Sequence, residues 1–253
     1  MNIGILCGHL LPDLVKKGET ISVETPYGPV VVQVSSLGNH ELFFIQRHGA
    51  GPGLPPHKVN YRGNIQALCA SHVSCILSVS TVGSMIKQIQ PGELVIPHDF
   101  LDMTKSRPAT FYDDTRVHVD MTDPFCPDLR LSLLEACKAT RTKYHDKGVY
   151  LATEGPRLET VAEINFFSGS ADIVGMTLVP EVVLAREKGI CFAALCLACN
   201  MAAGLQHRLP ADDIVNVFTK QEPMIAQVLR RTIESLDEHR SCHCAMDITK
   251  ATL

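Results

Sequence analysis

Short apolar runs rich in valine and isoleucine alternate with longer amphipathic stretches, and this alternation constrains the fold more than any other feature of the chain. The runs expected to form strands are Ile3–Leu6, Val30–Val34, Leu42–Gln46, Cys75–Ser80, Leu94–Pro97, Gly148–Ala152, Asp172–Val174 and Cys191–Cys199. The stretches expected to form helices are Lys58–Ser71, Pro127–Lys143, Glu159–Ser168, Val179–Lys188 and Ala211–Asp237. This order predicts an α/β fold with a mixed, mostly parallel central sheet flanked by helices.

The chain has 253 residues, a length that suits one large α/β domain. It contains no internal repeat, no low-complexity segment and no linker rich in proline or serine. We therefore predict a single domain over residues 1–240 and a C-terminal tail over residues 241–253, which carries the Cys-x-Cys pair Cys242 and Cys244.

Composition and charge exclude several classes of partner. The formal net charge is −4, and lysine and arginine form no block, so we expect no nucleic-acid-binding surface. No apolar run approaches the roughly 18 residues of a membrane span. The N-terminal residues Met1–Leu6 lack the charged start and long apolar core of a signal peptide. We expect a cytoplasmic protein.

Most of the ten cysteines lie inside apolar runs, which is typical of small buried residues in a reducing compartment. These include Cys69, Cys75, Cys191, Cys196 and Cys199. In the tail, Cys242 and Cys244 flank His243 and could form a disulfide, bind a soft metal or do neither. Because two cysteines and one histidine do not complete a structural zinc site, we predict no metal site.

Polar and glycine-rich loops follow nearly every expected strand. They are Arg47–Gly49, Ser80–Ser84, Glu154–Thr160, Gly175–Thr177 and Asn200–Ala202. In open α/β sheets ligands bind where the strands end and the loops begin. These loops therefore predict one binding site built from several strands.

Several of these stretches resemble the trimeric purine nucleoside phosphorylase and methylthioadenosine phosphorylase family. They are Arg47–Gly49 with His57–Arg62, Gly92–Pro97, Asp123–Pro127, Gly155–Glu163, and Val174–Thr177 with Val179–Glu181. The resemblance runs from about residue 3 to about residue 235. It implies a single α/β domain and a trimer, or a hexamer, whose sites lie near subunit interfaces. The expected partners are then a nucleoside and phosphate.

The implied reaction is attack of inorganic phosphate on the anomeric carbon of a purine nucleoside. Its transition state carries positive charge on the sugar and negative charge on the departing base. Such a reaction needs a positioned anion, a grip on the ribose and donors to the base, but no covalent nucleophile. We therefore expect phosphate as a co-substrate and no cofactor.

A set of cationic and hydroxyl side chains is expected to bind phosphate. An arginine fork matches phosphate oxygens, and hydroxyls complete the cradle. The set comprises Arg47, His48, Ser80, Thr81 and Thr177. The family usually has a Gly-Gly-Ser/Thr-Gly turn after its first strand, whereas this chain has Cys7-Gly8-His9-Leu10. His9 then replaces the hydroxyl residue, and it either donates to phosphate or lies in a remodelled loop that binds phosphate weakly.

Asn200 and Glu159 are the expected catalytic residues, because both would act on the base. The resemblance associates an asparagine and a glutamate at these positions with 6-oxopurines and an aspartate with adenine. A carboxylate at Glu159 can accept the N1–H of a 6-oxopurine, and the amide of Asn200 can donate to N7 or O6. Adenine has no proton on N1 and would face Glu159 unfavourably.

The remaining substrate contacts are expected around the sugar. By resemblance, Met176 packs beneath the ribose, with Gly175 and Leu158 nearby, and His118 reaches a neighbouring subunit's 5′ pocket. The position that binds a 5′-hydroxyl in ordinary nucleoside enzymes falls on Ala211 or a neighbour. An apolar side chain there favours a methylthio group over a hydroxyl.

Together these features predict phosphorolysis of a 6-oxopurine nucleoside, with S-methyl-5′-thioinosine as the preferred substrate. The alternatives are a general phosphorylase of inosine and guanosine or a methylthioadenosine phosphorylase. A different class, a nucleoside-binding protein without catalysis, is kept open because the loop after the first strand departs from the family.

Overall fold

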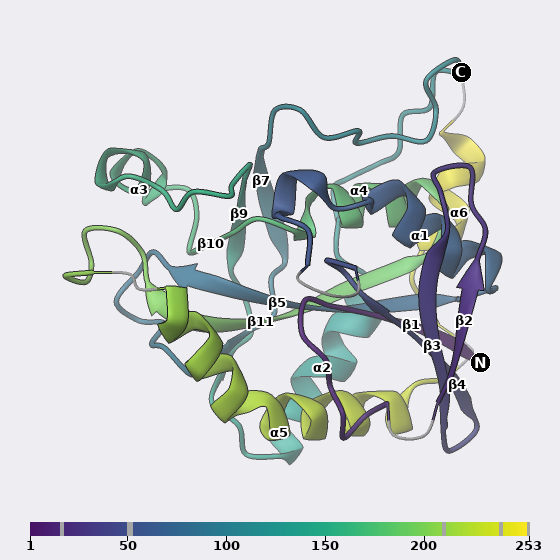
Figure 1. Ribbon diagram of the computed structural model, residues 1–253, viewed down its shortest axis with the longest axis horizontal. Coiled ribbons are helices and arrows are strands. Elements are labelled where there is room, and N and C mark those ends of the chain that lie inside the picture. The colour runs from purple at the N-terminus through teal and green to yellow at the C-terminus, as the bar shows by residue number, and fades with distance from the viewer. Residues whose placement is uncertain (16–17, 50–52, 209–210, 238–239, 252–253) are drawn as a thin grey trace.

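The computed structural model describes residues 1–15, 18–49, 53–208, 211–237 and 240–251 (Figure 1). Within these ranges the strands are β1 (Asn2–Cys7), β2 (Glu19–Val23), β3 (Val30–Leu37), β4 (His40–Gln46), β5 (Cys75–Ser84), β6 (Leu94–Val95), β7 (Asp99–Met103), β8 (Tyr144–His145), β9 (Val149–Thr153), β10 (Ile173–Gly175) and β11 (Cys191–Met201). The helices are α1 (Tyr61–Ala70), α2 (Pro127–Ala139), α3 (Val161–Phe167), α4 (Leu178–Glu187), α5 (Ala211–Ser235) and α6 (Cys244–Asp247), with 3-10 turns at Pro56–Lys58 and Ile248–Lys250.

The strands form one mixed sheet, in the order β2-β3-β4-β1-β5-β10-β9-β7, with β11 pairing to β5 and β6, and β8 to β6. The central pairings of β1 with β4 and of β5 with β1 and β11 are parallel. The pairings of β2 with β3, β3 with β4, β6 with β11 and β5 with β10 are antiparallel. The predicted fold class, a mixed and mostly parallel sheet, is confirmed.

Period-two alternation along the central strands builds a core on each face of the sheet. In β11 the side chains of Cys191, Leu195 and Leu197 enter the core beneath α2 and α5. The intervening Phe192 and Cys196 enter the opposite core, beneath α1 and α4. Figure 1 shows these two helix pairs on opposite sides of the sheet. Because β11 is buried on both faces, it reads in the sequence as a continuous apolar run.

Several predicted boundaries were wrong because local hydrogen bonds decide where a helix begins and ends. The first helix begins at Tyr61 instead of Lys58, because the side chain of Asn60 accepts a hydrogen bond from the backbone N–H of Gly63. The helix predicted to reach Lys143 ends at Ala139, and Thr140 is its C-cap.

Two further helix boundaries and one strand boundary also differ from the prediction. The predicted helix Glu159–Ser168 begins at Val161, where Thr160 and Glu163 form a capping box. The long C-terminal helix ends at Ser235 instead of Asp237, and the strand predicted to reach Pro97 ends at Val95. Strands β2, β7 and β8 were missed: β2 and β7 are largely exposed and lack an apolar run, and β8 has only two residues.

The described part of the tail packs against the domain. Cys244 is buried in the core beneath α2, and the Asp128 carboxylate accepts hydrogen bonds from the backbone of Ser241 and Cys242. Arg186 forms an ion pair with Asp247 at 2.6 Å. Among the described residues, no helix is long and apolar enough to cross a membrane.

Candidate active site

One cavity of about 310 Å³ opens at the end of the sheet where most of the polar loops meet. Its walls come from the ends of several strands, from the loops that follow them and from α5. The lining residues are Cys7–His9, Arg47, His48, Pro56, Val79–Gly83, Pro156, Leu158, Glu159, Val174–Thr177, Asn200, Ala202, Ile214 and Phe218. Of the residues proposed from the sequence, His9, Arg47, His48, Ser80, Thr81, Leu158, Glu159, Gly175, Met176, Thr177 and Asn200 all line this cavity.

Arg47 is held at the cavity wall by a buried ion pair. Its Nε donates to Oε1 of Glu181 at 2.5 Å, and its Nη2 donates to Oε2 of the same carboxylate at 3.0 Å. Ser78 and the carbonyl of Val79 accept further bonds from the guanidinium. Burial by itself lowers the pKa of Arg47, but Glu181 more than reverses this and leaves the pKa above its usual value. The guanidinium is therefore a fixed positive charge, and Nη1 has one acceptor for its two protons.

Two histidines lie beside this charge. Nδ1 of His48 is 2.7 Å from the carbonyl oxygen of Leu54, which fixes the ring. Burial lowers the pKa of His48, and Arg47 lowers it further. Burial also lowers the pKa of His9, with additional effects of His48 and Arg47. These shifts favour the neutral imidazoles. A neutral imidazole has one N–H, and in His48 this is the Nδ1–H that donates to Leu54, so His48 would donate to an anion only when it is protonated. The single N–H of neutral His9 could act as a donor directly.

Hydroxyl and backbone donors complete this part of the cavity. The Oγ of Ser80 lies 3.4 Å from Oγ1 of Thr177. The backbone N–H of Thr177 donates to the phenol oxygen of Tyr150 at 3.1 Å, and burial raises the pKa of Tyr150 to about 12. A Cβ atom on Gly175 would lie 2.4 Å from that phenol oxygen, so glycine is required there. Tyr150 thus positions the segment that brings Thr177 to the cavity.

A β-bulge turns Asn200 toward the cavity. The register between β11 and β5 shifts between Ala198 and Asn200, and Asn200 then pairs with Gly83. Such a bulge re-aims a side chain at the end of a strand. The amide Nδ2 of Asn200 donates to the carbonyl of Met201 at 2.9 Å and would lie 3.0 Å from a Cβ on Gly83. The missing side chain at Gly83 therefore makes room for the amide.

Glu159 stands in the loop between β9 and α3. Its Oε1 accepts a hydrogen bond from Oγ1 of Thr153 at 2.6 Å. The capping box of Thr160 fixes the start of α3 directly after it. A Cβ on Gly155, at φ +64°, would lie 2.5 Å from Sδ of Met176, so this glycine lets the loop pack against the methionine. The loop thereby brings Glu159 and Met176 to the same cavity.

The apolar part of the cavity comes from α5. Ile214 and Phe218 line it, and the ring of His9 stacks on Phe218 with centroids 4.2 Å apart. The side chain of Ala211, the residue expected in this role, lies outside the described residues. Ile214 and Phe218 lie one and two turns further along this helix and are the apolar side chains that it brings to the cavity.

His118 does not line the cavity. Its side chain is exposed, and its backbone N–H donates to the carbonyl of Ala251 at 2.8 Å. The structure thus places this ring on the surface, away from the residues that line the cavity.

Arg107 is a residue that the sequence analysis missed. Its buried guanidinium donates to the carbonyls of Thr153 and Glu154 at the end of β9, and to those of Met176 and Val179 around the start of α4. It therefore joins the two loops that carry Glu159 and Thr177. A single arginine in a polar loop carries no sequence signal of this role. Glu181, the buried partner of Arg47, lies in the stretch Val179–Glu181, and nothing in the sequence indicates its role.

Comparison with known proteins agrees with this geometry. The sequence model of the Phosphorylase superfamily matches residues 2–234. The chain is 43% identical to a probable S-methyl-5′-thioinosine phosphorylase of Methanopyrus kandleri, with 98% of each chain covered. It is also 43% identical to a probable 6-oxopurine nucleoside phosphorylase of Dictyoglomus turgidum, over 96% of this chain and 95% of the other. The structure of a methylthioadenosine phosphorylase from an Antarctic soil metagenomic library superposes with a TM-score of 0.92 at 33% identity, covering 99% of this chain and 92% of that one.

Proposed function

The chain belongs to the Phosphorylase superfamily. From that premise we propose that it cleaves 6-oxopurine nucleosides with inorganic phosphate and that S-methyl-5′-thioinosine is its preferred substrate. The products would be hypoxanthine and 5-methylthioribose 1-phosphate. The observation that carries the proposal is the meeting of Asn200 and Glu159 in one cavity with Arg47 and Thr177. Base donors and acceptors thus face the same space as an anion cradle.

The roles follow from the chemistry of each group. Arg47, His48, Ser80, Thr81 and Thr177 are proposed to hold phosphate, which needs no metal and no cofactor in this scheme. Phosphate would attack the anomeric carbon, the bond to the base nitrogen would break, and the base would take the electron pair. Asn200 donates to the base as negative charge develops, and Glu159 accepts from N1–H. Met176 and Gly175 are proposed to flank the ribose.

The 5′ substituent is proposed to lie on Ile214 and Phe218. These apolar surfaces offer no partner for a hydroxyl but bury a methylthio group, at about 0.8 kcal/mol per buried CH₂ group. A second candidate is phosphorolysis of inosine and guanosine. The observation that favours it is His9, whose ring stacks on Phe218 and could donate to a 5′-hydroxyl. His9 would then donate to the 5′-hydroxyl of the sugar instead of to phosphate.

We also propose a homotrimer, or a hexamer built from trimers, in the cytoplasm. Leu158 lines the cavity and is 37% exposed, and Val161 and Phe166 on the following helix α3 are 49% and 78% exposed. Apolar surface of this kind next to a site is typical of an interface. Cysteine-rich apolar strands fit a reducing compartment.

The deciding experiment compares kcat/KM for S-methyl-5′-thioinosine, inosine, guanosine and S-methyl-5′-thioadenosine at saturating phosphate. The proposal requires the first to be the best substrate and the last to be poor. Faster inosine than methylthioinosine would establish the second candidate. Binding of hypoxanthine without phosphorolysis of any of the four would indicate a nucleoside-binding protein.

A further inference from the structure

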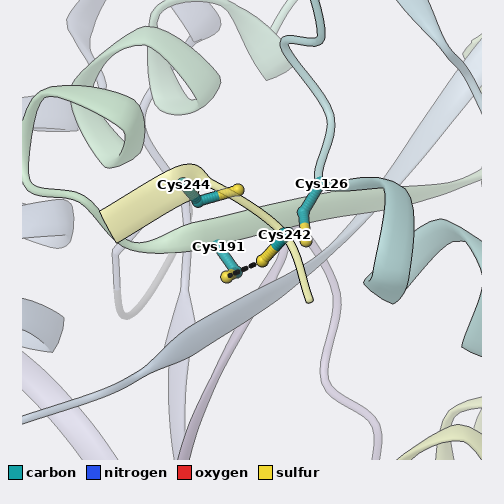
Figure 2. Close-up of side chains that lie close together, drawn as sticks. All are labelled: Cys126, Cys191, Cys242 and Cys244. Carbon is teal, nitrogen blue, oxygen red and sulfur yellow. Dashed lines mark hydrogen bonds between the residues drawn. The ribbon is translucent and has the colours of Figure 1, made fainter. Parts of the chain in front are cut away.

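Four cysteines from three distant segments meet at the end of the sheet away from the cavity. The Sγ atoms of Cys126, Cys191, Cys242 and Cys244 all lie within 4.8 Å of one another. Figure 2 shows their side chains gathered around one point. Cys126 precedes α2, Cys191 is the first residue of β11, and the other two form the Cys-x-Cys pair of the tail.

The backbone holds these cysteines in place independently of their sulfur atoms. The N–H of Cys126 donates to the carbonyl of Phe192, at 2.8 Å, which ties the start of α2 to β11. The N–H of Cys242 donates to the carboxylate of Asp128 at 2.9 Å. Three of the four side chains are buried, with exposures of 0% for Cys126, 4% for Cys191 and 2% for Cys244. The cluster is therefore pre-organised.

We propose that these four thiols form a structural tetrathiolate site for Zn²⁺. Zinc binds thiolate sulfur at about 2.3 Å, so four sulfurs at the corners of a tetrahedron lie about 3.8 Å apart. The separations in the cluster bracket this value, since the sulfurs of Cys191 and Cys242 are 3.4 Å apart and no pair exceeds 4.8 Å. A disulfide needs only two sulfurs at about 2.05 Å and does not account for four converging side chains.

Nearby charges suit such a centre. Zn²⁺ with four thiolates carries a net charge of −2, and its binding releases the four thiol protons. Arg186 interacts electrostatically with Cys244, and Arg240 with Cys191. Because Arg186 also forms an ion pair with Asp247, these two guanidinium groups offset part of the negative charge. A tetrathiolate site closed by four protein ligands leaves no position for substrate, which makes its role structural.

The site would fasten the tail to the domain. Cys191 begins β11 and Asn200 stands near its end, nine residues or about 30 Å away at the rise of an extended strand. The ion would therefore lie far from the reacting atoms and would stabilise the fold without entering catalysis. This inference does not depend on the substrate proposed above.

The first test measures zinc and free thiols in the full-length protein purified without chelator. We expect one zinc per chain by plasma mass spectrometry, and ten alkylated cysteines when the protein is denatured without reductant. Fewer than ten alkylated cysteines would mean a disulfide and would overturn the proposal. Absence of zinc, both as purified and after Zn²⁺ is added to the reduced protein, would overturn it equally.

The second test compares two half-buried cysteines. Cys242→Ser removes one sulfur from the cluster, whereas Cys69→Ser removes a cysteine outside it. We expect Cys242→Ser to raise the Kd for Zn²⁺ by at least about 10–100-fold, the loss typical of even an outer-shell change, and Cys69→Ser to leave it unchanged. Co²⁺ in place of zinc should give the visible spectrum of a tetrahedral thiolate site in the wild-type protein and in Cys69→Ser only. Equal zinc affinity of the two variants would contradict the assignment.

Discussion

Nε of Arg47 lies 2.5 Å from Oε1 of Glu181, and both side chains are buried, so the cation at the cavity wall has its own buried counter-ion. Removing one member of such a pair leaves the other charge buried and unpaired, which typically costs about 3–5 kcal/mol. Arg47 is therefore both an anion ligand in the proposed function and a structural partner of Glu181. The variant Arg47→Ala would change two properties at once.

We accordingly predict that Arg47→Ala lowers the free energy of unfolding by about 3–5 kcal/mol, in addition to weakening phosphate use. Arg47→Lys keeps the positive charge but loses the fork, so it should unfold less readily than Arg47→Ala while still raising the KM for phosphate. Denaturant titration and phosphate titration of both variants separate the two effects. A phosphate KM unchanged in Arg47→Lys would remove Arg47 from the anion cradle.

Base choice is predicted to depend on Asn200 and Glu159. Asn200→Asp should shift preference toward 6-aminopurines, because a carboxyl can accept from the exocyclic amine and, when protonated, donate to N7. In the wild-type protein the Asn200 amide donates to the carbonyl of Met201. A negatively charged aspartate at position 200 would be repelled by that carbonyl oxygen, so the protonated form of the aspartate is favoured. Glu159→Gln should cost 6-oxopurine use about 1–3 kcal/mol. The measurement is the ratio of kcat/KM for methylthioinosine and methylthioadenosine, which must change in both variants for the assignment to stand.

The two cavity histidines predict a pH dependence. Burial, His48 and Arg47 lower the pKa of His9, and burial and Arg47 lower that of His48, from 6.5 in each case. Because these pKa values are lower in the folded protein, the unfolded chain binds protons more readily than the folded one. The contribution of the two neutral histidines to the free energy of unfolding is therefore complete above pH 6.5 and is lost as the pH falls through the folded-state pKa values. Phosphate should offset this loss, because an anion favours the protonated imidazoles.

Denaturant midpoints at pH 7.5 and 5.5, with and without phosphate, test this dependence. The double variant His9→Ala/His48→Ala should flatten the loss of stability toward low pH, whereas His207→Ala, at an exposed position, should retain it. An unaltered pH slope in the double variant would show that other groups cause the acid sensitivity.

Arg107 is predicted to act as a positioning residue. Replacing it by methionine leaves four loop carbonyls without their donor and should lower kcat/KM by about 10–100-fold, equally for methylthioinosine and inosine, because both substrates rely on the same loops. Arg62→Met, which removes a solvent-exposed ion pair with Asp113, should change stability and kcat/KM little. A change in the ratio of the two substrates would mean that Arg107 contacts the 5′ group itself.

How far the sequence could predict the site depends on whether a residue's partner is local. Asn200 directly follows an apolar strand signal, and Glu159 lies in the polar loop after another, so both loops could be predicted from the sequence alone. The partner of Arg47 lies 134 residues away at Glu181, and no pattern near either residue indicates the pair. The same holds for the four cysteines, whose tail pair gave an incomplete ligand set until the fold added Cys126 and Cys191.

The final prediction concerns assembly, and it follows from the exposed ring of His118. In a single protomer this ring does not line the cavity, while Leu158 at the cavity edge is partly open to solvent. If a partner subunit's His118 closes the 5′ pocket, the contact joins two different surfaces, and such contacts close into a ring or run on as a filament. We predict that sedimentation will show a closed trimer or a multiple of it.

His118→Ala should then lower kcat/KM for methylthioinosine and leave the affinity for free hypoxanthine unchanged, because the base binds at Asn200 and Glu159. The backbone bond from residue 118 to Ala251 survives this substitution, so folding is not the cause of any loss. A stable monomer with full activity toward methylthioinosine would refute both the trimer and the role of His118.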